Sequence, residues 1–266
     1  TNSLSSANEE FSRLYEPSIH DTDVFRAADL AQAKEFSDVA LVVLGRVAGE
    51  SCDSPKVQYK QTERNGDIVT DDSRTYLDIS AEEEELLTYV GENYDKVIVI
   101  VNSTNVMNLG FMDSIEGLDA CLIVCGTGAY GALAILNTLY GVTESPSGRT
   151  PDTYVYDFKS SPAYATAGAE GLGAYTNAGG FYPTTVTYTS DGKNNPFPQV
   201  SYVDYVEDIY VGYKWYETAD AESYFDGVQN QYGSGYEGVV QYPFGYGLSY
   251  TTFSKEVLER SPVGNT

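Results

Sequence analysis

The sequence predicts an α/β protein built on a mostly parallel sheet with helices on its faces. Short, continuous apolar runs recur along the first half of the chain, and such runs are typical of strands buried on both faces. Segments with helical patterning alternate with them, and this strand–helix order favours parallel pairing. The 266 residues, of which 42% are hydrophobic, are enough for a substantial core.

The first predicted helix leads directly into the first predicted strand. Residues 1–25 are polar and irregular, and residues 26–37 are patterned as a helix. The run DVALVVLG at 38–45 is aliphatic and β-branched, which indicates a buried parallel strand. The region 46–79 is rich in Asp, Thr, Ser and Asn, and we expect a long loop there. Long loops in compact domains commonly carry function.

A helix with a well-defined start is predicted after this loop. Ser80 and Glu83 fit the S-x-x-E capping box. The acidic run 82–85 falls in the first turn, where the helix dipole favours negative charge. The run is thereby explained without a ligand.

Two more strands and a helix complete the regular part. KVIVIVN at 96–102 and ACLIVC at 120–125 are predicted strands, and 132–141 is a predicted helix. After Pro151 the composition shifts to Tyr, Gly, Thr and Asn, with short strand-like pieces such as 184–188. We expect loops and an antiparallel annex there, without a further long amphipathic helix or a second domain.

The charge balance argues against two classes of partner. The 15 Lys and Arg against 39 Asp and Glu give a net charge of −24, which repels nucleic acid and anionic membrane surfaces. No apolar run approaches the roughly 20 residues that span a bilayer, and the first residues lack the pattern of a signal peptide. The 24 Tyr weakly favour neutral, hydroxyl-rich ligands such as sugars.

Cysteine and histidine chemistry is not expected. His20 is the only histidine among 266 residues, and the three Cys form no CxxC motif. Cys121 and Cys125 would be roughly 13 Å apart in a strand and could not pair with each other.

Gly126–Gly131 (GTGAYG) fits G-x-G-x-x-G, follows a predicted strand and opens a predicted helix. That pattern is a dinucleotide fingerprint. The alternative is that these glycines only let the chain turn tightly from strand to helix, and the net charge and the position on the third strand favour it.

The segment LGRVAGESCDS at 44–54 leaves the carboxyl end of the first predicted strand, where ligands bind in open parallel sheets. Glu50 follows Gly49, so the backbone there can approach a ligand. Glu50 could act as a general acid if burial raised its pKa, with Asp53 as its partner. The alternative is that Glu50 is a solvated loop residue.

A third candidate is PSGRTP at 146–151 with two aromatic-rich companions, YVEDIYVGYKWYE at 205–217 and QYPFGYGLSYTTF at 241–253. Such segments can form a stacking surface for sugar rings. By composition alone, a structural role in the core and in turns is favoured.

In their order along the chain, these segments resemble the α/β sandwich domain of glycoside hydrolase family 3, which includes many β-glucosidases. The resemblance covers residues 30–253, and PSGR and FGYGLSYTTF are its most specific parts. It implies a three-layer α/β/α sandwich with a mostly parallel central sheet and an irregular Tyr/Gly-rich annex. The domain would occupy residues 26–253, between an irregular segment at 1–25 and a tail at 254–266.

The resemblance also implies a retaining mechanism, in which two carboxyl groups about 5 to 5.5 Å apart act on the glycosidic bond. In the family the nucleophile is an aspartate next to Trp on a separate (β/α)8 barrel, whereas the only Trp here is Trp215 in VGYKWYE. The expected partners are therefore a barrel, of the same or a companion polypeptide, and a β-linked oligosaccharide or glycoside. No metal or organic cofactor is expected.

By position, Glu50 matches the general acid/base of the family, and Arg46 and Asp53 are implied to shape the loop or to contact sugar hydroxyls. The chain departs from the family pattern at Ser51, Ser54, Thr150 and Asp208, and the family's opening strand before residue 26 is not evident. A non-catalytic scaffold or carbohydrate-binding domain and a nucleotide-binding domain are the alternatives. The composition resembles that of secreted bacterial enzymes.

Overall fold

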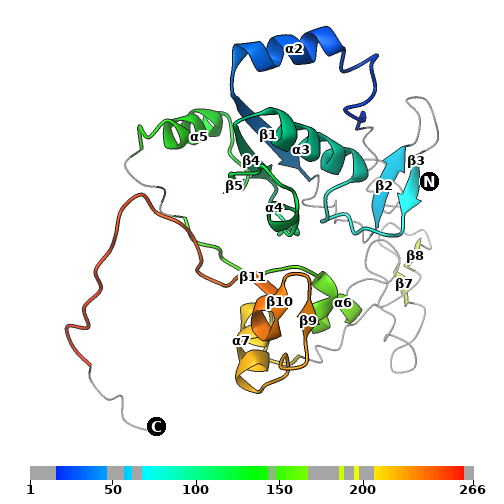
Figure 1. Ribbon diagram of the computed structural model, residues 1–266. Coiled ribbons are helices and arrows are strands. Elements are labelled where there is room, and N and C mark those ends of the chain that lie inside the picture. The colour runs from blue at the N-terminus through cyan, green and yellow to red at the C-terminus, as the bar shows by residue number, and fades with distance from the viewer. Residues whose placement is uncertain are drawn as a thin grey trace.

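The regular core is a parallel sheet formed by β1 (Val39–Gly45), β4 (Lys96–Asn102) and β5 (Ala120–Val124), in the order β1-β4-β5 (Figure 1). The computed structural model describes residues 16–46, 57–61, 68–143, 146, 148–166, 186–188, 195–197 and 207–260. The three strands lie where the apolar runs predict them, and their parallel pairing confirms the predicted fold class.

The register brings the carboxyl ends of the three strands to one edge. Gly45 pairs with Asn102, which in turn pairs with Val124. The segments that follow β1, β4 and β5 therefore all leave the sheet at this edge, which we call the carboxyl edge.

One face of the sheet carries the main core. Helix α3 (Ala81–Asn93) buries Leu87 and Val90 there, and the short helix α4 (Phe111–Ser114) contributes Phe111. The buried members of this core are Val42, Leu44, Ile79, Leu87, Val90, Val97, Val99, Val101, Met107, Leu109, Phe111 and Tyr154. Full burial of each large aliphatic side chain contributes about 1.5–3 kcal/mol.

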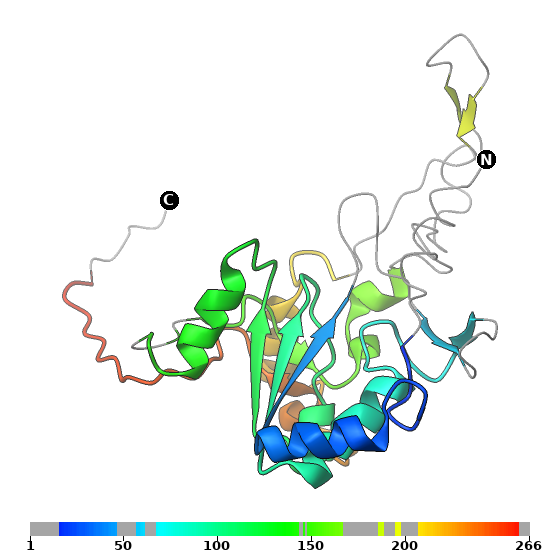
Figure 2. The ribbon, with the colours of Figure 1, turned by 90° about the horizontal axis from the view of Figure 1, so that it is seen from above.

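Helix α5 (Gly131–Leu139) lies on the opposite side of the sheet, and α2 (Ala27–Phe36) runs beside β1. Figure 2 shows α3 and α5 on opposite sides of the sheet, which gives three layers. Neither α2 nor α5 buries a residue, and Val39, Leu41 and Val43 of β1 stay exposed. This side is therefore packed more loosely than the side of α3.

A hairpin interrupts the region predicted as a long loop. Strands β2 (Gln58–Gln61) and β3 (Ile68–Asp71) pair antiparallel, with Gln58 opposite Asp71. The prediction of a continuous loop over 46–79 is therefore wrong. Polar residues in both strands hide the pattern, because their pairing depends on cross-strand contacts rather than on an apolar run.

The Tyr/Gly-rich annex has a small core of its own. Strands β6 (Tyr154–Val155) and β11 (Val240–Tyr242) pair antiparallel, and α7 (Tyr213–Ala221) packs beside them. Its buried members are Val155, Tyr216, Ala219, Phe225, Val239 and Val240. Tyr154 belongs to the main core and Val155 to this one, so the alternating side chains of β6 connect the two.

The other annex elements are short. They are η1 (Phe158–Ser160), α6 (Pro162–Thr166), β7 (Val186–Tyr188), β8 (Asn195–Phe197), β9 (Gln229–Asn230), β10 (Gly233–Ser234) and η2 (Gly235–Gly238). β7 pairs with β8 and β9 with β10, both antiparallel. The sequence did not predict the nine-residue helix α7, because its aromatic side chains resemble those of the surrounding loops.

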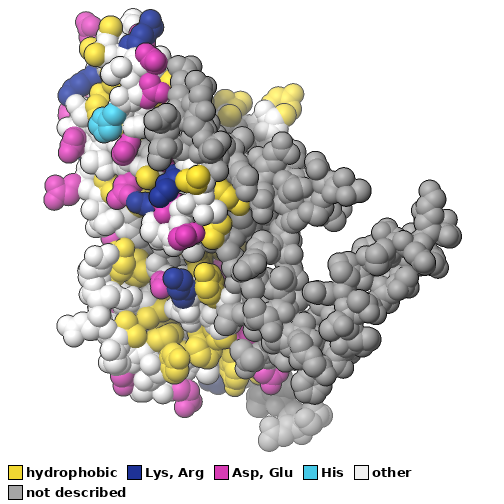
Figure 3. All heavy atoms as spheres, turned by 90° about the vertical axis from the view of Figure 1, so that its right-hand side faces the viewer, with side chains coloured by type: hydrophobic (Ala, Val, Ile, Leu, Met, Phe, Trp, Pro, Cys, Tyr) yellow, Lys and Arg dark blue, Asp and Glu magenta, His cyan; other side chains and the backbone are white. Residues whose placement is uncertain are grey.

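Acidic and basic side chains are interspersed on the described part of the face shown in Figure 3, without a continuous basic patch. Among the residues that the structure describes, no helix is long and apolar enough to cross a membrane.

Candidate functional site

The carboxyl edge of the sheet is the first place to look for a site, because ligands bind at this edge in open parallel sheets. Arg46 follows β1 there, Ser103 follows β4 and Cys125 follows β5. Of the three candidate site residues predicted from the sequence, Arg46 is described by the structure. Glu50 and Asp53 lie outside the described residues, so their predicted roles stay predictions.

All five N–H groups of the Arg46 guanidinium are used within the chain. Two of them reach the Glu83 carboxylate, with Nη1 at 2.8 Å from Oε1 and Nη2 at 2.6 Å from Oε2. The other three donate to backbone carbonyls, from Nε to Tyr76, from Nη1 to Gly45 and from Nη2 to Asp78, each at 2.7 Å. No N–H remains for a sugar hydroxyl, so this geometry favours the loop-shaping role among the two implied for Arg46.

The Arg46–Glu83 pair is buried, with 3% and 8% of the two side chains exposed. Burial by itself would lower the pKa of Arg46, but the hydrogen bonds and the charge of Glu83 outweigh it, so the pKa lies above its ordinary value. The guanidinium also lies over the Tyr76 ring, 5.6 Å from its centroid. Arg46 is therefore a fixed cation at the end of β1.

Gln58 is a second residue bound to the same backbone segment. Its Nε2 donates to the Asp78 carbonyl at 3.1 Å and lies 3.5 Å from the Tyr76 carbonyl oxygen. Its Oε1 accepts from the backbone N–H of Tyr59 at 2.9 Å. Gln58 is 5% exposed, so its amide is committed to these partners.

The capping box predicted for α3 is present and is joined by a residue that the sequence did not indicate. Ser80 Oγ accepts from the Glu83 N–H at 3.1 Å, and Glu83 Oε2 accepts from the Ser80 N–H at 2.8 Å. Ser80 Oγ also donates to Glu16 at 2.6 Å. Burial raises the pKa of Glu16, and the negative charge of Glu83 raises it further.

Glu83 is not available for chemistry on a substrate. Arg46 binds both of its oxygens, and the Ser80 backbone binds one of them as well. The sequence interpretation accounted for Glu83 by the capping box and the helix dipole. The structure adds that Glu83 holds Arg46, which lies 37 positions earlier in the sequence.

The glycine-rich turn after β5 has a backbone reason for its composition. Gly126 and Gly128 have positive φ values of 47° and 61°. A Cβ on Gly131 would lie 2.2 Å from Cβ of Thr127. The structure thus accounts for the motif as a tight turn into α5.

Two of the described cysteines lie in β5 and directly after it. Cys121 and Cys125 are both free, and their spacing predicts that they do not pair with each other. Burial raises the pKa of the Cys121 thiol to about 12, so it stays protonated and unreactive at neutral pH. Among the described residues, no group of three or more His, Cys, Asp or Glu side chains is placed to hold a metal ion.

The PSGRTP segment lies against the aromatic C-terminal motif. Thr150 donates its N–H to the Tyr246 carbonyl at 2.7 Å and its hydroxyl to the Pro243 carbonyl at 2.7 Å. Arg149 donates to the Gly247 carbonyl. These contacts give PSGRTP and the C-terminal motif a joint structural role.

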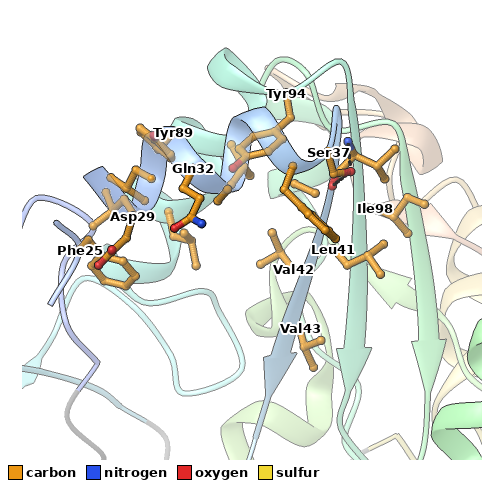
Figure 4. Close-up of a pocket in the computed structure, with 18 of the residues that line it drawn as sticks. Phe25, Asp29, Gln32, Ser37, Leu41, Val42, Val43, Tyr89, Tyr94 and Ile98 are labelled. Atoms are coloured by element: carbon orange, nitrogen blue, oxygen red, sulfur yellow. Dashed lines mark hydrogen bonds between the residues drawn. The ribbon is translucent and has the colours of Figure 1, made fainter. Parts of the chain in front are cut away.

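A groove of about 920 Å³ runs beside β1, between this strand and α2 (Figure 4). Its lining is mainly apolar, with Leu41 and Val43 of β1 on its wall. Asp29 is the one acid among the described lining residues, and it is ion-paired with Arg26 at 2.7 Å. The described lining therefore lacks the two carboxyl groups that glycoside hydrolysis requires.

Comparison with known proteins relates residues 21–250 to the glycosyl hydrolase family 3 C-terminal domain. Over 241 residues the chain is 29% identical to β-glucosidase A of Butyrivibrio fibrisolvens, and this match covers 88% of the chain and 24% of that protein. It is 28% identical over 222 residues to a β-glucosidase of Ruminococcus albus, covering 84% of the chain and 17% of that protein. The chain thus spans a quarter or less of these relatives.

A solved structure agrees with this relationship. The crystal structure of a β-glucosidase from Paenibacillus barengoltzii superposes with a TM-score of 0.53 at 25% sequence identity. The superposition covers 93% of the chain and 20% of that protein.

Proposed function

Because the chain belongs to the glycosyl hydrolase family 3 C-terminal domain family, we propose that it is the sandwich domain of a retaining, β-glucosidase-like enzyme. The domain shares its active site with a (β/α)8 barrel of the same or a companion polypeptide, and the barrel carries the nucleophile. The substrate is a β-linked oligosaccharide or glycoside. Support comes from relatives that are β-glucosidases and are at least four times as long as the matched part.

In this proposal Glu50 is the general acid/base. It first protonates the glycosidic oxygen of the leaving group while the barrel's carboxylate attacks the anomeric carbon. It then takes a proton from the water that hydrolyses the glycosyl-enzyme intermediate. Asp53 lies on the same segment and shapes it or binds a sugar hydroxyl. The reaction uses acid/base chemistry and positioning by protein groups.

The observation that carries the proposal is the anchoring of segment 47–57, which contains Glu50. Arg46 precedes this segment and Gln58 follows it, and both side chains donate to the Asp78 carbonyl. Arg46, at the carboxyl edge, and Gln58 are therefore fixed on either side of the stretch that contains Glu50, and this supports the proposal that the stretch presents an acid to a substrate held by another domain.

The test compares hydrolysis of a panel of nitrophenyl β-glycosides by this chain alone and by the longest polypeptide that contains it. We expect activity in the longer protein only, and Glu50→Gln in that protein should lower turnover by about 100-fold or more. Azide should restore the rate on a substrate with a good leaving group, because it needs no general base to attack the intermediate.

Other outcomes point to other functions. An unchanged turnover of the Glu50→Gln protein would favour a non-catalytic scaffold or carbohydrate-binding domain. Activity of the isolated chain would mean that a second catalytic carboxylate lies within these 266 residues, with Asp53 as the nearest candidate. Heat released on adding NAD or NADP would favour a nucleotide-binding domain.

A further inference from the structure

A cleft of about 630 Å³ lies in the annex, between the chain that follows β6 and the β9–β10 hairpin, which Figure 1 shows next to β11. This volume is within the range of small-molecule sites, about 300–1,000 Å³. Tyr156, Asp157 and Lys159 line it from one segment, and Gln231 and Tyr232 line it from the hairpin. The cleft therefore exists only because folding brings these two segments together.

Two tyrosine rings form an aromatic wall of the cleft. Tyr156 and Tyr232 are stacked in parallel, with ring centroids 3.8 Å apart and 3° between the ring planes. The Tyr156 hydroxyl donates to the Asp113 carboxylate at 2.8 Å, and the Tyr156 carbonyl accepts from the Asn108 amide at 2.5 Å. Both rings are half-buried, so the wall is held in place and still accessible. Such a wall offers a rigid apolar surface for the C–H groups on the face of a pyranose ring.

The hairpin side of the cleft is also preformed. Asn230 Oδ1 accepts from the Tyr232 N–H at 2.9 Å, and Asn230 Nδ2 donates to the Gly238 carbonyl at 2.7 Å. A Cβ on Gly238 would lie 2.8 Å from the Gly233 carbonyl oxygen, so a glycine is needed where the hairpin closes on η2. Because the cleft is already formed, a ligand does not have to order it on binding.

Several polar groups of the cleft have hydrogen-bonding capacity left over. Lys159 and Gln231 are exposed, and within the described part of the chain neither side chain has a hydrogen-bond partner. The same holds for the Tyr232 hydroxyl. The Asp157 carboxylate accepts from the Lys159 N–H at 2.8 Å through Oδ1, which leaves Oδ2 for another donor.

This mixture of groups favours a neutral ligand that is rich in hydroxyls. Asp157 can only accept, Lys159 can only donate and Gln231 can do both, and a hydroxyl is a suitable partner for all three. Asp157 and Lys159 are the charged residues among the described lining, so their charges balance. The net charge of −24 repels anionic ligands such as nucleotides and uronates. A pyranose combines an apolar C–H face with hydroxyls around its edge and so matches both the wall and the polar groups.

We propose that this cleft binds a neutral oligosaccharide, with one pyranose ring against the Tyr156–Tyr232 wall and its hydroxyls bound by Asp157, Lys159 and Gln231. Binding there requires no catalytic carboxylate, so the inference goes beyond the proposed function and does not depend on Glu50. A protein that holds a polysaccharide in this way raises the local concentration of the sugar chain around itself.

The test is affinity electrophoresis of the 266-residue chain in native gels that contain mixed-linkage β-glucan, xylan or polygalacturonate. One cleft variant is Tyr232→Ala, which removes a ring of the wall. The other is Lys159→Ala with Gln231→Ala, which removes two free polar groups at exposed positions. The matched controls are Tyr130→Ala, at an 86% exposed position at the start of α5, and Lys34→Ala, at an exposed position of α2.

We expect at least one of the two neutral polysaccharides to retard the parent chain, and polygalacturonate not to retard it. Tyr232→Ala should raise the Kd at least about tenfold, and the Lys159→Ala, Gln231→Ala double variant at least about fivefold. Both controls should bind like the parent. Thermal unfolding shows whether each variant is folded. If Tyr232→Ala is not, the double variant decides, because both of its positions are exposed.

No retardation of the parent in either neutral gel would overturn this inference. Retardation of the folded cleft variants equal to that of the parent, or stronger retardation by polygalacturonate, would overturn it as well. Nitrophenyl β-glycoside hydrolysis by the longest polypeptide that contains the chain separates the inference from the proposed function. If Glu50→Gln leaves turnover unchanged there while the cleft variants lose retardation, only the proposed function is wrong. If Glu50→Gln lowers turnover and the cleft variants keep their retardation, only the cleft inference is wrong.

Discussion

Glu16 and Glu83 bind the same hydroxyl, that of Ser80. The Ser80 Oγ donates to the Glu16 carboxylate at 2.6 Å and accepts from the Glu83 backbone N–H at 3.1 Å. Arg46 pairs with Glu83, whereas Glu16 accepts a hydrogen bond from the Ser80 hydroxyl. A residue of the N-terminal segment is thus coupled electrostatically to the Arg46–Glu83 pair.

This coupling predicts a pH dependence of stability. Burial first, and the charge of Glu83 second, raise the pKa of Glu16 above its ordinary value of 4.5. The folded protein therefore holds the proton more tightly than the unfolded chain does. The stabilisation is fully present below pH 4.5 and is lost as the pH rises through the folded-state pKa.

Glu16→Gln should consequently raise the thermal midpoint at pH 7.5 relative to the parent protein. The gain should shrink as the pH falls through 4.5, because Glu16 then becomes protonated in the unfolded chain as well. For a chain of this size, about 1 kcal/mol of added stability raises the thermal midpoint by about 2–4 °C. Glu92→Gln, at an exposed position of α3, serves as the control. The prediction would be contradicted by a difference in thermal midpoint between Glu16→Gln and the parent protein that is the same at pH 7.5 and at pH 4.

A close contact between two glycines limits substitution in α3. A Cβ on Gly91 would lie 2.3 Å from the Glu116 carbonyl oxygen, and Gly117 opposite has φ of 84°. Gly91→Ala would gain about 1 kcal/mol of helix propensity but must displace the backbone. We expect net destabilisation by about 2 kcal/mol or more in denaturant unfolding. Gly148→Ala, where a Cβ meets nothing within 4 Å, should be nearly neutral.

The unequal packing on the two sides of the sheet can be measured with matched leucines. Leu87 of α3 is 0% exposed and Leu133 of α5 is 60% exposed. Leu87→Ala should lower the free energy of unfolding by about 2–5 kcal/mol. Leu133→Ala should change it by less than about 0.5 kcal/mol. Similar losses for both would mean that α5 is buried as deeply as α3.

The two described cysteines should differ in alkylation. Cys125 is exposed, whereas burial raises the pKa of Cys121 to about 12. In a Cys52→Ser background, iodoacetamide at pH 8 should label Cys125 and leave Cys121 unlabelled until the protein is unfolded. Peptide mapping by mass spectrometry identifies the labelled residue. Early labelling of Cys121 would show that β5 opens to solvent in the native state.

Local sequence was sufficient for the elements whose patterns lie within a few neighbouring residues. The apolar run of β4 was predicted with its observed bounds, Lys96–Asn102, and the capping box at Ser80 was predicted with its partner Glu83. For β4 the decisive feature is an apolar run that must be buried, and for the capping box it is a pair of contacts between residues three positions apart. The family motifs added the family and the three-layer arrangement, because their order along the chain is specific.

The sequence by itself determined the three strands of the parallel sheet, the start of α3 and the family. The tertiary structure alone decided that Arg46 binds Glu83, that Gln58 meets the same carbonyls, and that the polar strands β2 and β3 pair. These contacts join residues that are distant in the chain, so no local pattern encodes them. A buried polar group must find its partner wherever the folded backbone brings one within hydrogen-bonding distance, and only the packing of α3 on the sheet determines where that is.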